Sequence, residues 1–209
     1  MNNKFPMFFL VLLLPSCGAV YTPEYLPLIQ SVLFGAKDIK VDQDFYDDQP
    51  YSFAKVNLGR EQTAIVTLGF GDTDAYKWYT SSGAGIFTKD GKIVKLTSFV
   101  HDMSLINPAE IVYNQDTILK NSSFISLKNP KGFFLQEFKL EFHQTEEIDY
   151  LSQKLQVDLY LEVVTTEGYN WSYTNKYWVD PSSGMVIKSV QKVHPRSPAF
   201  TLTYFYKYL

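Results

Sequence analysis

The side chains best suited to chemistry in this sequence are aromatic. Three tryptophans, Trp78, Trp171 and Trp178, stand among nearby tyrosines. Residues 169–173 read Tyr-Asn-Trp-Ser-Tyr, so on a strand the three rings would share one face. Aromatic faces bind the C–H faces of sugar rings, while amides and hydroxyls hydrogen-bond sugar hydroxyls. The pattern supports two interpretations. One is a glycan-contacting surface, and the other, commoner in β proteins, is a set of rings that fills the core and its rim.

The titratable residues show no spacing that is typical of catalysis or metal binding. The three histidines, His101, His143 and His194, lie far apart in the sequence and lack metal-ligand spacing. We therefore expect them to be surface or hydrogen-bonding residues. Glu137 and Glu141 share a strand face, but a lysine between them is typical of a charge-balanced solvent face. We expect no catalytic residue, no metal and no cofactor.

The composition excludes several classes of protein. The 209 residues are 45% apolar and 16% aromatic, which is too hydrophobic for intrinsic disorder. The net charge of −3 argues against a nucleic-acid partner, because phosphate binding needs an excess of cations. A single cysteine excludes an internal disulfide.

The first 16 residues have the layout of a secretory signal. Lys4 supplies a positive charge, and residues 7–14 are eight consecutive apolar residues, too few to span a bilayer. Residues 14–17, Leu-Pro-Ser-Cys, resemble the lipobox of bacterial lipoproteins. By this resemblance Cys17 would receive a diacylglycerol and become the first residue of the mature chain. The alternative is an ordinary signal peptide followed by an idle cysteine. We expect residues 1–16 to be a lipoprotein signal peptide and residues 17–209 to form a single β-rich domain.

Hydrophobic periodicity predicts one helix followed by strands. In residues 25–34, Leu28, Ile29, Val32 and Leu33 form a helical apolar stripe. Further along the chain the period becomes two, which indicates antiparallel strands with one face buried. We predict a mainly all-β fold of about nine to eleven strands. Its form would be a strongly curved antiparallel sheet, a half-barrel or a sandwich, with one short N-terminal helix.

The alternation also predicts which face of each strand is buried. The expected buried sets are Phe138, Leu140 and Phe142 in residues 134–143; Leu155, Val157, Leu159, Leu161 and Val163 in residues 154–163; and Phe200, Leu202, Tyr204, Tyr206 and Tyr208 at the C-terminus. Two tight turns are expected as well. Asp90-Gly91 suits a primed hairpin turn, and residues 180–184, Asp-Pro-Ser-Ser-Gly, suit a second hairpin.

Three stretches resemble the YjbF/GfcB lipoproteins, a bacterial group linked to capsule and exopolysaccharide production. The first covers residues 50–69 and contains Pro-Tyr-Ser-Phe-Ala and Ala-Ile-Val-Thr-Leu-Gly. The second covers residues 78–97, from Trp-Tyr-Thr-Ser-Ser-Gly to Gly-Lys-Ile-Val-Lys-Leu-Thr. The third and most specific begins with Asn-Lys-Tyr-Trp-Val-Asp at residues 175–180 and continues through Lys-Ser-Val-Gln at residues 188–191. Lys92 departs from the Gly-Arg that the family usually has after the turn.

The resemblance implies a non-catalytic lipoprotein of the outer membrane, anchored through Cys17 and facing the periplasm. It would serve polysaccharide assembly or export beside an outer-membrane β-barrel and a periplasmic export protein, with polysaccharide as a further partner. The resemblance supplies no catalytic residue. The residues that we single out for glycan or partner contact are Trp78, Trp171, Asn175, Tyr177, Trp178, Asp180 and Gln191.

Two further expectations depend on burial. Gln191 shares a strand face with Met185 and Ile187, so it must be hydrogen-bonded if that face is buried. We expect Gln191 to hydrogen-bond backbone groups near residues 175–180 or to line a pocket.

The alternative function is a carrier of an apolar ligand such as an acyl chain, which would require an internal cavity of several hundred Å³.

Overall fold

The computed structural model describes residues 39–59, 62–69, 75–116 and 118–207. These residues form one short helix and twelve strands. The elements in chain order are α2 (Gln43–Asp48), β1 (Phe53–Leu58), β2 (Gln62–Leu68), β3 (Tyr76–Tyr79), β4 (Gly85–Lys89), β5 (Lys92–Thr97), β6 (Met103–Ile106), β7 (Leu119–Lys128), β8 (Lys131–Tyr150), β9 (Gln153–Thr166), β10 (Trp171–Val179), β11 (Val186–Gln191) and β12 (Phe200–Phe205). Among the described residues, no helix is long and apolar enough to cross a membrane.

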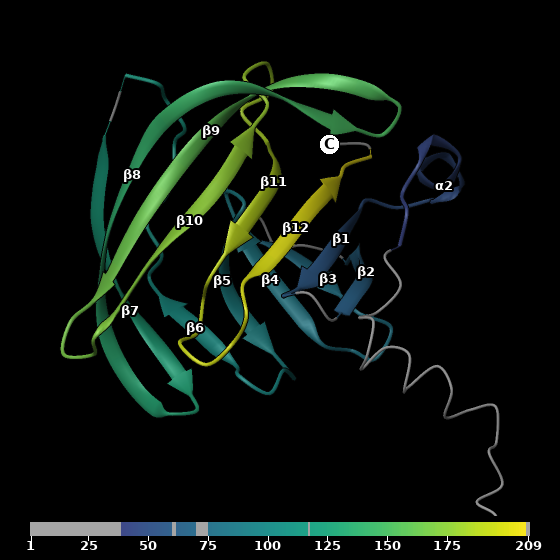
Figure 1. Cartoon of the computed structure of the whole chain (residues 1–209). Coiled ribbons are helices and arrows are strands. Elements are labelled where there is room, and N and C mark those ends of the chain that lie inside the picture. Colours follow the sequence, from purple (N-terminus) through teal and green to yellow (C-terminus); the bar gives the residue numbers. More distant parts are fainter. Residues whose placement is uncertain (1–38, 60–61, 70–74, 117, 208–209) are drawn as a thin grey trace, which may run out of the picture.

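The strands form one closed antiparallel barrel. Each strand pairs with its neighbours in sequence, and β1 pairs with both β2 and β12. In Figure 1 the long strands β8, β9 and β10 form one wall, and the shorter strands β1–β6 lie across from them. The predicted all-β antiparallel fold is confirmed. The sheet has twelve strands rather than nine to eleven, and among the described residues each strand pairs with two neighbours, so the sheet closes on itself.

The barrel interior contains most of the side chains that the alternation predicted for β8 and β12, while Phe142 and Tyr206 are partly buried against the core and Tyr208 lies outside the described residues. Phe138 and Leu140 from β8 and Phe200, Leu202 and Tyr204 from β12 are all buried in one hydrophobic core. Trp78 lies in the same core and is fully buried, and its indole N–H donates to Thr88 Oγ1 at 2.9 Å.

The face predicted to be buried in β9 is wrong for its C-terminal half. Tyr160 and Glu162 point into the barrel, whereas Val163 is 40% exposed. Val157 and Leu159 are buried as predicted, but on the outside of the barrel, in a second, small cluster with Trp178. The alternation of β9 is as predicted, but at its C-terminal end the face with Tyr160 and Glu162 lines the interior, because Lys92, Asn175 and Tyr177 supply partners there for a buried carboxylate.

The predicted helix at residues 25–34 lies outside the described residues. The observed helix α2 is capped by Asp42, whose side chain accepts a hydrogen bond from the Phe45 N–H at 3.0 Å. Phe45 and Tyr46 pack against Phe53 of β1, and the Tyr46 hydroxyl donates to the Tyr206 carbonyl at 2.8 Å. These contacts fix α2 to the barrel where β1 and β12 meet.

The hairpin of β8 and β9 arches over one end of the barrel. Figure 1 shows its tip reaching across toward the end of β12. Tyr150 at this tip donates its hydroxyl to the Tyr204 carbonyl at 2.8 Å and stacks on Phe205 with ring centroids 5.3 Å apart. A bulge between Phe142 and Gln144 gives β8 the bend that this path requires.

Both predicted hairpin turns are present. Asp90 and Gly91 have φ of +50° and +75°, as a primed turn requires, and join β4 to β5. The turn at residues 180–184 joins β10 to β11, with Gly184 at φ +71°. Asp180 holds this second turn, because its carboxylate accepts hydrogen bonds from the Ser182 N–H and from the hydroxyls of Ser182 and Ser183.

Candidate functional site

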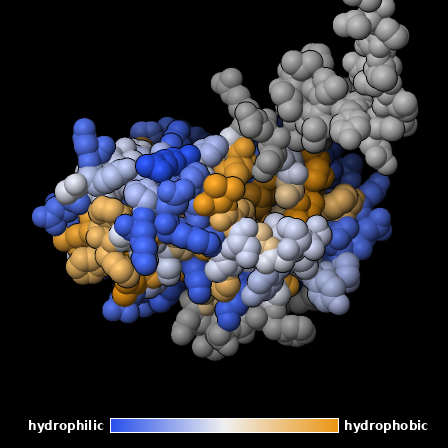
Figure 2. Space-filling view, turned by 90° about the horizontal axis from the view of Figure 1, so that it is seen from below, coloured by the Kyte–Doolittle hydropathy of each residue, from blue (hydrophilic) through white to orange (hydrophobic). Residues whose placement is uncertain are grey.

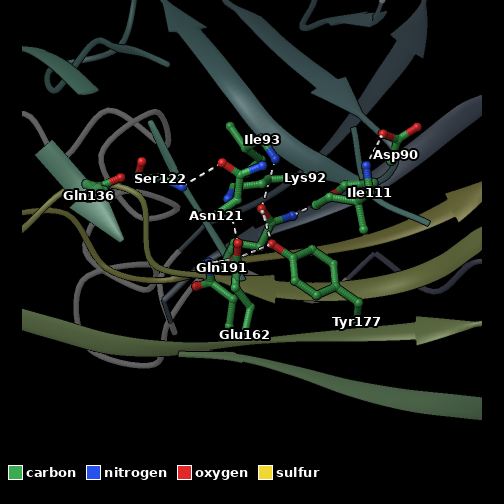
Figure 3. A network of polar contacts seen from close by, with 12 residues as sticks. Asp90, Lys92, Ile93, Ile111, Asn121, Ser122, Gln136, Glu162, Tyr177 and Gln191 are labelled. Atoms are coloured by element: carbon green, nitrogen blue, oxygen red, sulfur yellow. Dashed lines mark hydrogen bonds and ion pairs between the residues drawn. The ribbon is translucent and has the colours of Figure 1, made fainter. Parts of the chain in front are cut away.

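The barrel interior contains a buried carboxylate, Glu162 of β9, which is fully shielded from solvent. Lys92 Nζ lies 2.5 Å from Glu162 Oε1. The Asn175 side-chain amide and the Tyr177 hydroxyl each donate to Glu162 Oε2 at 2.8 Å. Figure 3 shows Glu162, Tyr177, Lys92 and Gln191 converging from different strands. We call these residues together with Asn175 the interior polar network.

Gln191 connects this network to the turn between β4 and β5. Its side-chain carbonyl accepts from the Ile93 N–H at 2.8 Å, and its amide donates to the Gly91 carbonyl at 2.8 Å and to Ser189 Oγ at 2.9 Å. The prediction that Gln191 is buried and hydrogen-bonded is confirmed. Its backbone partners belong to β5 and the turn before it, whereas its contact with β10 is through the Tyr177 hydroxyl at 3.4 Å.

The surroundings of Tyr177 keep its hydroxyl protonated, and Lys92 has more than one favourable contact. Lys92 Nζ also lies 3.9 Å from the centre of the Phe138 ring, so the ammonium has a second favourable contact. Burial raises the pKa of Tyr177 well above its usual value, and the charge of Glu162 raises it further. Tyr177 is therefore a permanent hydrogen-bond donor. Glu162, which accepts from three donors, is held as part of the scaffold rather than offered to a substrate.

Most of the residues singled out for glycan or partner contact are buried in the barrel or stabilise a turn. Asn175, Tyr177 and Gln191 converge in the interior polar network. Trp78 belongs to the main core, and Asp180 holds a turn. Asn175, Tyr177, Gln191 and Trp78 are buried, which favours the interpretation that they fill the core and hydrogen-bond its strands together.

The remaining two tryptophans lie apart from that network. Trp178 faces outward, donates its indole N–H to Glu146 Oε1, and lies under Lys188 Nζ at 4.9 Å. Trp171 packs against the main core beside Tyr173, with ring centroids 4.6 Å apart. The structure does not bring the seven residues together into one surface.

Sequence reasoning missed the two charged members of the network. Glu162 alternates with the residues of β9 that the sequence predicts to be buried, and Lys92 stands out in the sequence only because it departs from a family pattern. No local pattern in the sequence indicates that Lys92 and Glu162 form a pair, because the two residues lie 70 positions apart.

An apolar hollow of about 550 Å³ opens at one end of the barrel. Its apolar lining residues include Val56, Val66, Ile86, Phe99 and Phe200, and its polar lining residues include His101 and Arg196. Figure 2 looks at the molecule from below and shows apolar side chains reaching the surface near its middle. The volume is in the range that the carrier hypothesis requires, but the hollow is open to solvent, and the barrel interior itself is filled by aromatic side chains such as Trp78, Tyr177 and Tyr204.

Two histidines stack beside this hollow. The rings of His101 and His194 lie 4.4 Å apart and nearly parallel, at 11°. His194 is fully buried, and its Nδ1 accepts a hydrogen bond from the Arg196 N–H at 3.1 Å. Burial lowers the pKa of His194, and His101, Arg196 and Lys192 lower it further. Within the described residues, no group of three or more His, Cys, Asp or Glu side chains is placed to hold a metal ion.

The stacked histidines predict a loss of stability in mild acid. Below the ordinary histidine pKa of about 6.5 the unfolded chain takes up a proton that native His194 resists, so the unfolded state gains in relative stability as pH falls. We expect Tm to drop by a few degrees between pH 7.5 and 5.5, and we expect His194→Gln to shrink that drop. The exposed His143 is the matched control, and His143→Gln should keep the full drop. Equal drops in the two variants would contradict this account.

Comparison with known proteins places this barrel in a family. A family model described as "Group 4 capsule polysaccharide lipoprotein gfcB, YjbF" matches residues 28–205. The chain belongs to the YjbF/GfcB family. The YjbF/GfcB model spans all twelve barrel strands and ends at the last residue of β12, so the whole described barrel is the family's domain.

Two curated members of the YjbF/GfcB family and one solved structure are similar to this chain. The uncharacterized lipoprotein YjbF of Escherichia coli (strain K12) is 25% identical over 190 residues, which cover 86% of each chain. The uncharacterized lipoprotein GfcB of the same organism is 22% identical and covers 76% of this chain and 78% of its own. A crystal structure of the hypothetical lipoprotein YmcC from Escherichia coli (K12) superposes with a TM-score of 0.71 at 18% identity. It covers 87% of this chain and 95% of that chain, and it shows that the two share a fold.

Proposed function

We propose that this protein is a lipid-anchored, non-catalytic accessory factor in the assembly or export of a capsule polysaccharide or exopolysaccharide. The observation that carries the proposal is the family match over residues 28–205, because the family's description names a capsule polysaccharide lipoprotein. The anchor is the lipidated Cys17 in the outer membrane, and the barrel faces the periplasm. Its partners are an outer-membrane β-barrel, a periplasmic export protein and the polysaccharide.

The state of the buried acids supports a non-catalytic role. A general acid or base needs a carboxyl group that a substrate can reach. Glu162 is shielded and has three donors. Asp158 is also buried, and it accepts hydrogen bonds from Thr145 Oγ1 at 2.6 Å and from the Gln115 amide at 2.7 Å. Both acids are fully engaged in holding strands together.

Surface polysaccharide in a deletion strain tests the proposal. We expect the level of surface polysaccharide to fall on deletion and to return with the wild-type gene. Complementation with Cys17→Ser should fail, because the variant lacks the thiol that the lipid anchor requires. The amount of each protein in the envelope fraction is the control for expression.

An unchanged polysaccharide level would contradict the proposal and favour the second candidate, a carrier of an apolar ligand. The observation that favours this candidate is the hollow of about 550 Å³ with its apolar lining. Native mass spectrometry of the protein from membranes would then show a bound lipid-sized mass. Purely unliganded protein would argue against the carrier.

A further inference from the structure

The strand register aligns one side chain from each of five neighbouring strands in a band on the outside of the barrel. Phe87 of β4 pairs with Lys95 of β5, which pairs with Ser104 of β6. Ser104 pairs with Ser126 of β7, which pairs with Phe133 of β8. Paired residues of antiparallel strands point to the same face of the sheet. The band therefore runs straight across five neighbouring strands.

The band faces solvent rather than the core. Ile86, Leu96, Ile125 and Leu127, which are sequence neighbours of band residues, are buried in the main core. Alternation along each strand then places the band outside. Phe133 is 68% exposed, which is unusual for a ring of this size.

Two hollows lie along this band and adjoin each other. One has a volume of about 480 Å³ and the other about 470 Å³, and both are lined by Lys95 and Ser104. The first extends to Phe133, and the second extends to Phe87. We call them together the outer groove. Neighbouring strands are about 4.8 Å apart, so five strands give a groove of about 19 Å, which suits an extended polymer better than a single small ligand.

The outer groove is basic although the protein is acidic. Its lining includes four lysines, Lys89, Lys95, Lys128 and Lys131, and Asp102 is the sole acid among the described lining residues. The whole chain carries a net charge of −3. Lys128 contacts Asp102 at 3.3 Å but remains 70% exposed. A concentration of positive charge on an acidic protein favours an anionic ligand at this place.

We propose that the outer groove binds an acidic polysaccharide. The exposed face of Phe133 suits stacking on a sugar ring, the hydroxyls of Ser104 and Ser126 suit hydrogen bonds to sugar hydroxyls, and the lysines suit the carboxylates of uronic acid units. This assignment rests on the proposed function and adds the chemical class of the polymer and the surface that holds it. It moves glycan contact from the buried residues of β10 and β11 to the outside of β4–β8.

Binding of a defined acidic oligosaccharide to the full lipidated protein in detergent tests the groove. The probe is a fluorescent oligogalacturonate, and a neutral dextran oligomer of equal length is the control ligand. We expect the oligogalacturonate to bind, the dextran to bind at least about tenfold more weakly, and binding to weaken with added salt. Phe133→Ala should weaken oligogalacturonate binding about fivefold to tenfold. Lys95→Gln combined with Lys131→Gln should also weaken it and reduce the salt dependence.

Two matched variants separate the groove from the rest of the surface. Phe124→Ala removes another exposed ring of the same sheet that lies outside both hollows, and Lys154→Gln removes an exposed lysine elsewhere. Both should bind like the wild type. No binding of oligogalacturonate, equal loss in Phe124→Ala and Phe133→Ala, or preferential binding to phosphatidylglycerol vesicles would overturn the proposal.

The deletion strain distinguishes failure of this inference from failure of the proposed function. If the wild-type gene restores polysaccharide but the purified protein ignores acidic glycans, the accessory role stands and the groove assignment is wrong. If deletion leaves polysaccharide unchanged while Phe133→Ala still weakens oligogalacturonate binding, the groove stands and the accessory role is wrong. If both hold, complementation with Phe133→Ala should restore less polysaccharide than complementation with Phe124→Ala.

Discussion

Glu162→Gln destabilises the barrel by about 3–5 kcal/mol, because it leaves the Lys92 ammonium without its counter-charge in the interior. The Lys92 side chain is 11% exposed, so water cannot replace the lost carboxylate. A loss of this size is a large fraction of the stability of a single domain. Urea unfolding followed by tryptophan fluorescence measures it as a lower midpoint.

A second ion pair of the same length provides the matched control. Lys139 Nζ and Glu141 Oε2 are also 2.5 Å apart, but their side chains are 41% and 37% exposed. Lys139→Gln should therefore cost less than about 1 kcal/mol. Equal effects of Glu162→Gln and Lys139→Gln would mean that burial does not decide the strength of these pairs.

The double variant Lys92→Met/Glu162→Gln answers the case in which Glu162→Gln does not fold. It removes both charges, and the new amide oxygen can still accept from the Asn175 amide and the Tyr177 hydroxyl. Replacing a buried ion pair as a unit is far less costly than breaking it. We expect the double variant to be more stable than Glu162→Gln alone, and a double variant that is less stable would contradict the account.

Gly91→Ala is expected to cost several kcal/mol and to be the most damaging glycine substitution in the turns of the barrel. A Cβ at this position would lie 2.3 Å from Val186 Cγ2, and the backbone has φ of +75°. The turn cannot move away easily, because the Gly91 carbonyl accepts hydrogen bonds from Gln191 and from the Tyr204 hydroxyl at 3.2 Å. The midpoint of urea unfolding is again the measurement.

Gly83→Ala measures how much stability is lost from the left-handed backbone conformation alone, without a steric clash. Gly83 has φ of +84°, but nothing lies within 4 Å of the position that its Cβ would take. This variant should therefore lose only about 1–2 kcal/mol from the left-handed conformation. Adding Val186→Ala to Gly91→Ala should recover part of the loss by making room. If Gly91→Ala and Gly83→Ala were equally stable, the packing of the turn against β11 would not be the cause.

The local patterns of the sequence determined the class of the fold and several of its strands and hairpin connections. Period-two alternation in residues 134–143 and near the C-terminus identified strands whose apolar faces do line the barrel. Asp90-Gly91 and residues 180–184 identified hairpins that are present, because the conformation of a tight turn depends on its own few residues. The three stretches that resemble the YjbF/GfcB lipoproteins were sufficient to identify the family, whose model matches residues 28–205.

The tertiary structure alone decided which face of β9 is buried and where a ligand could bind. Alternation reports two faces, but the choice between them depends on what lies across the barrel. Glu162 can be inside because Lys92 meets it there from 70 residues away. The outer groove has the same origin, because Lys95, Ser104 and Phe133 become neighbours only through the register of successive strand pairs. The turns and hydrophobic patterns of several successive hairpins together set that register, and the burial of a charge depends on its partner, so neither is encoded within one segment of the chain.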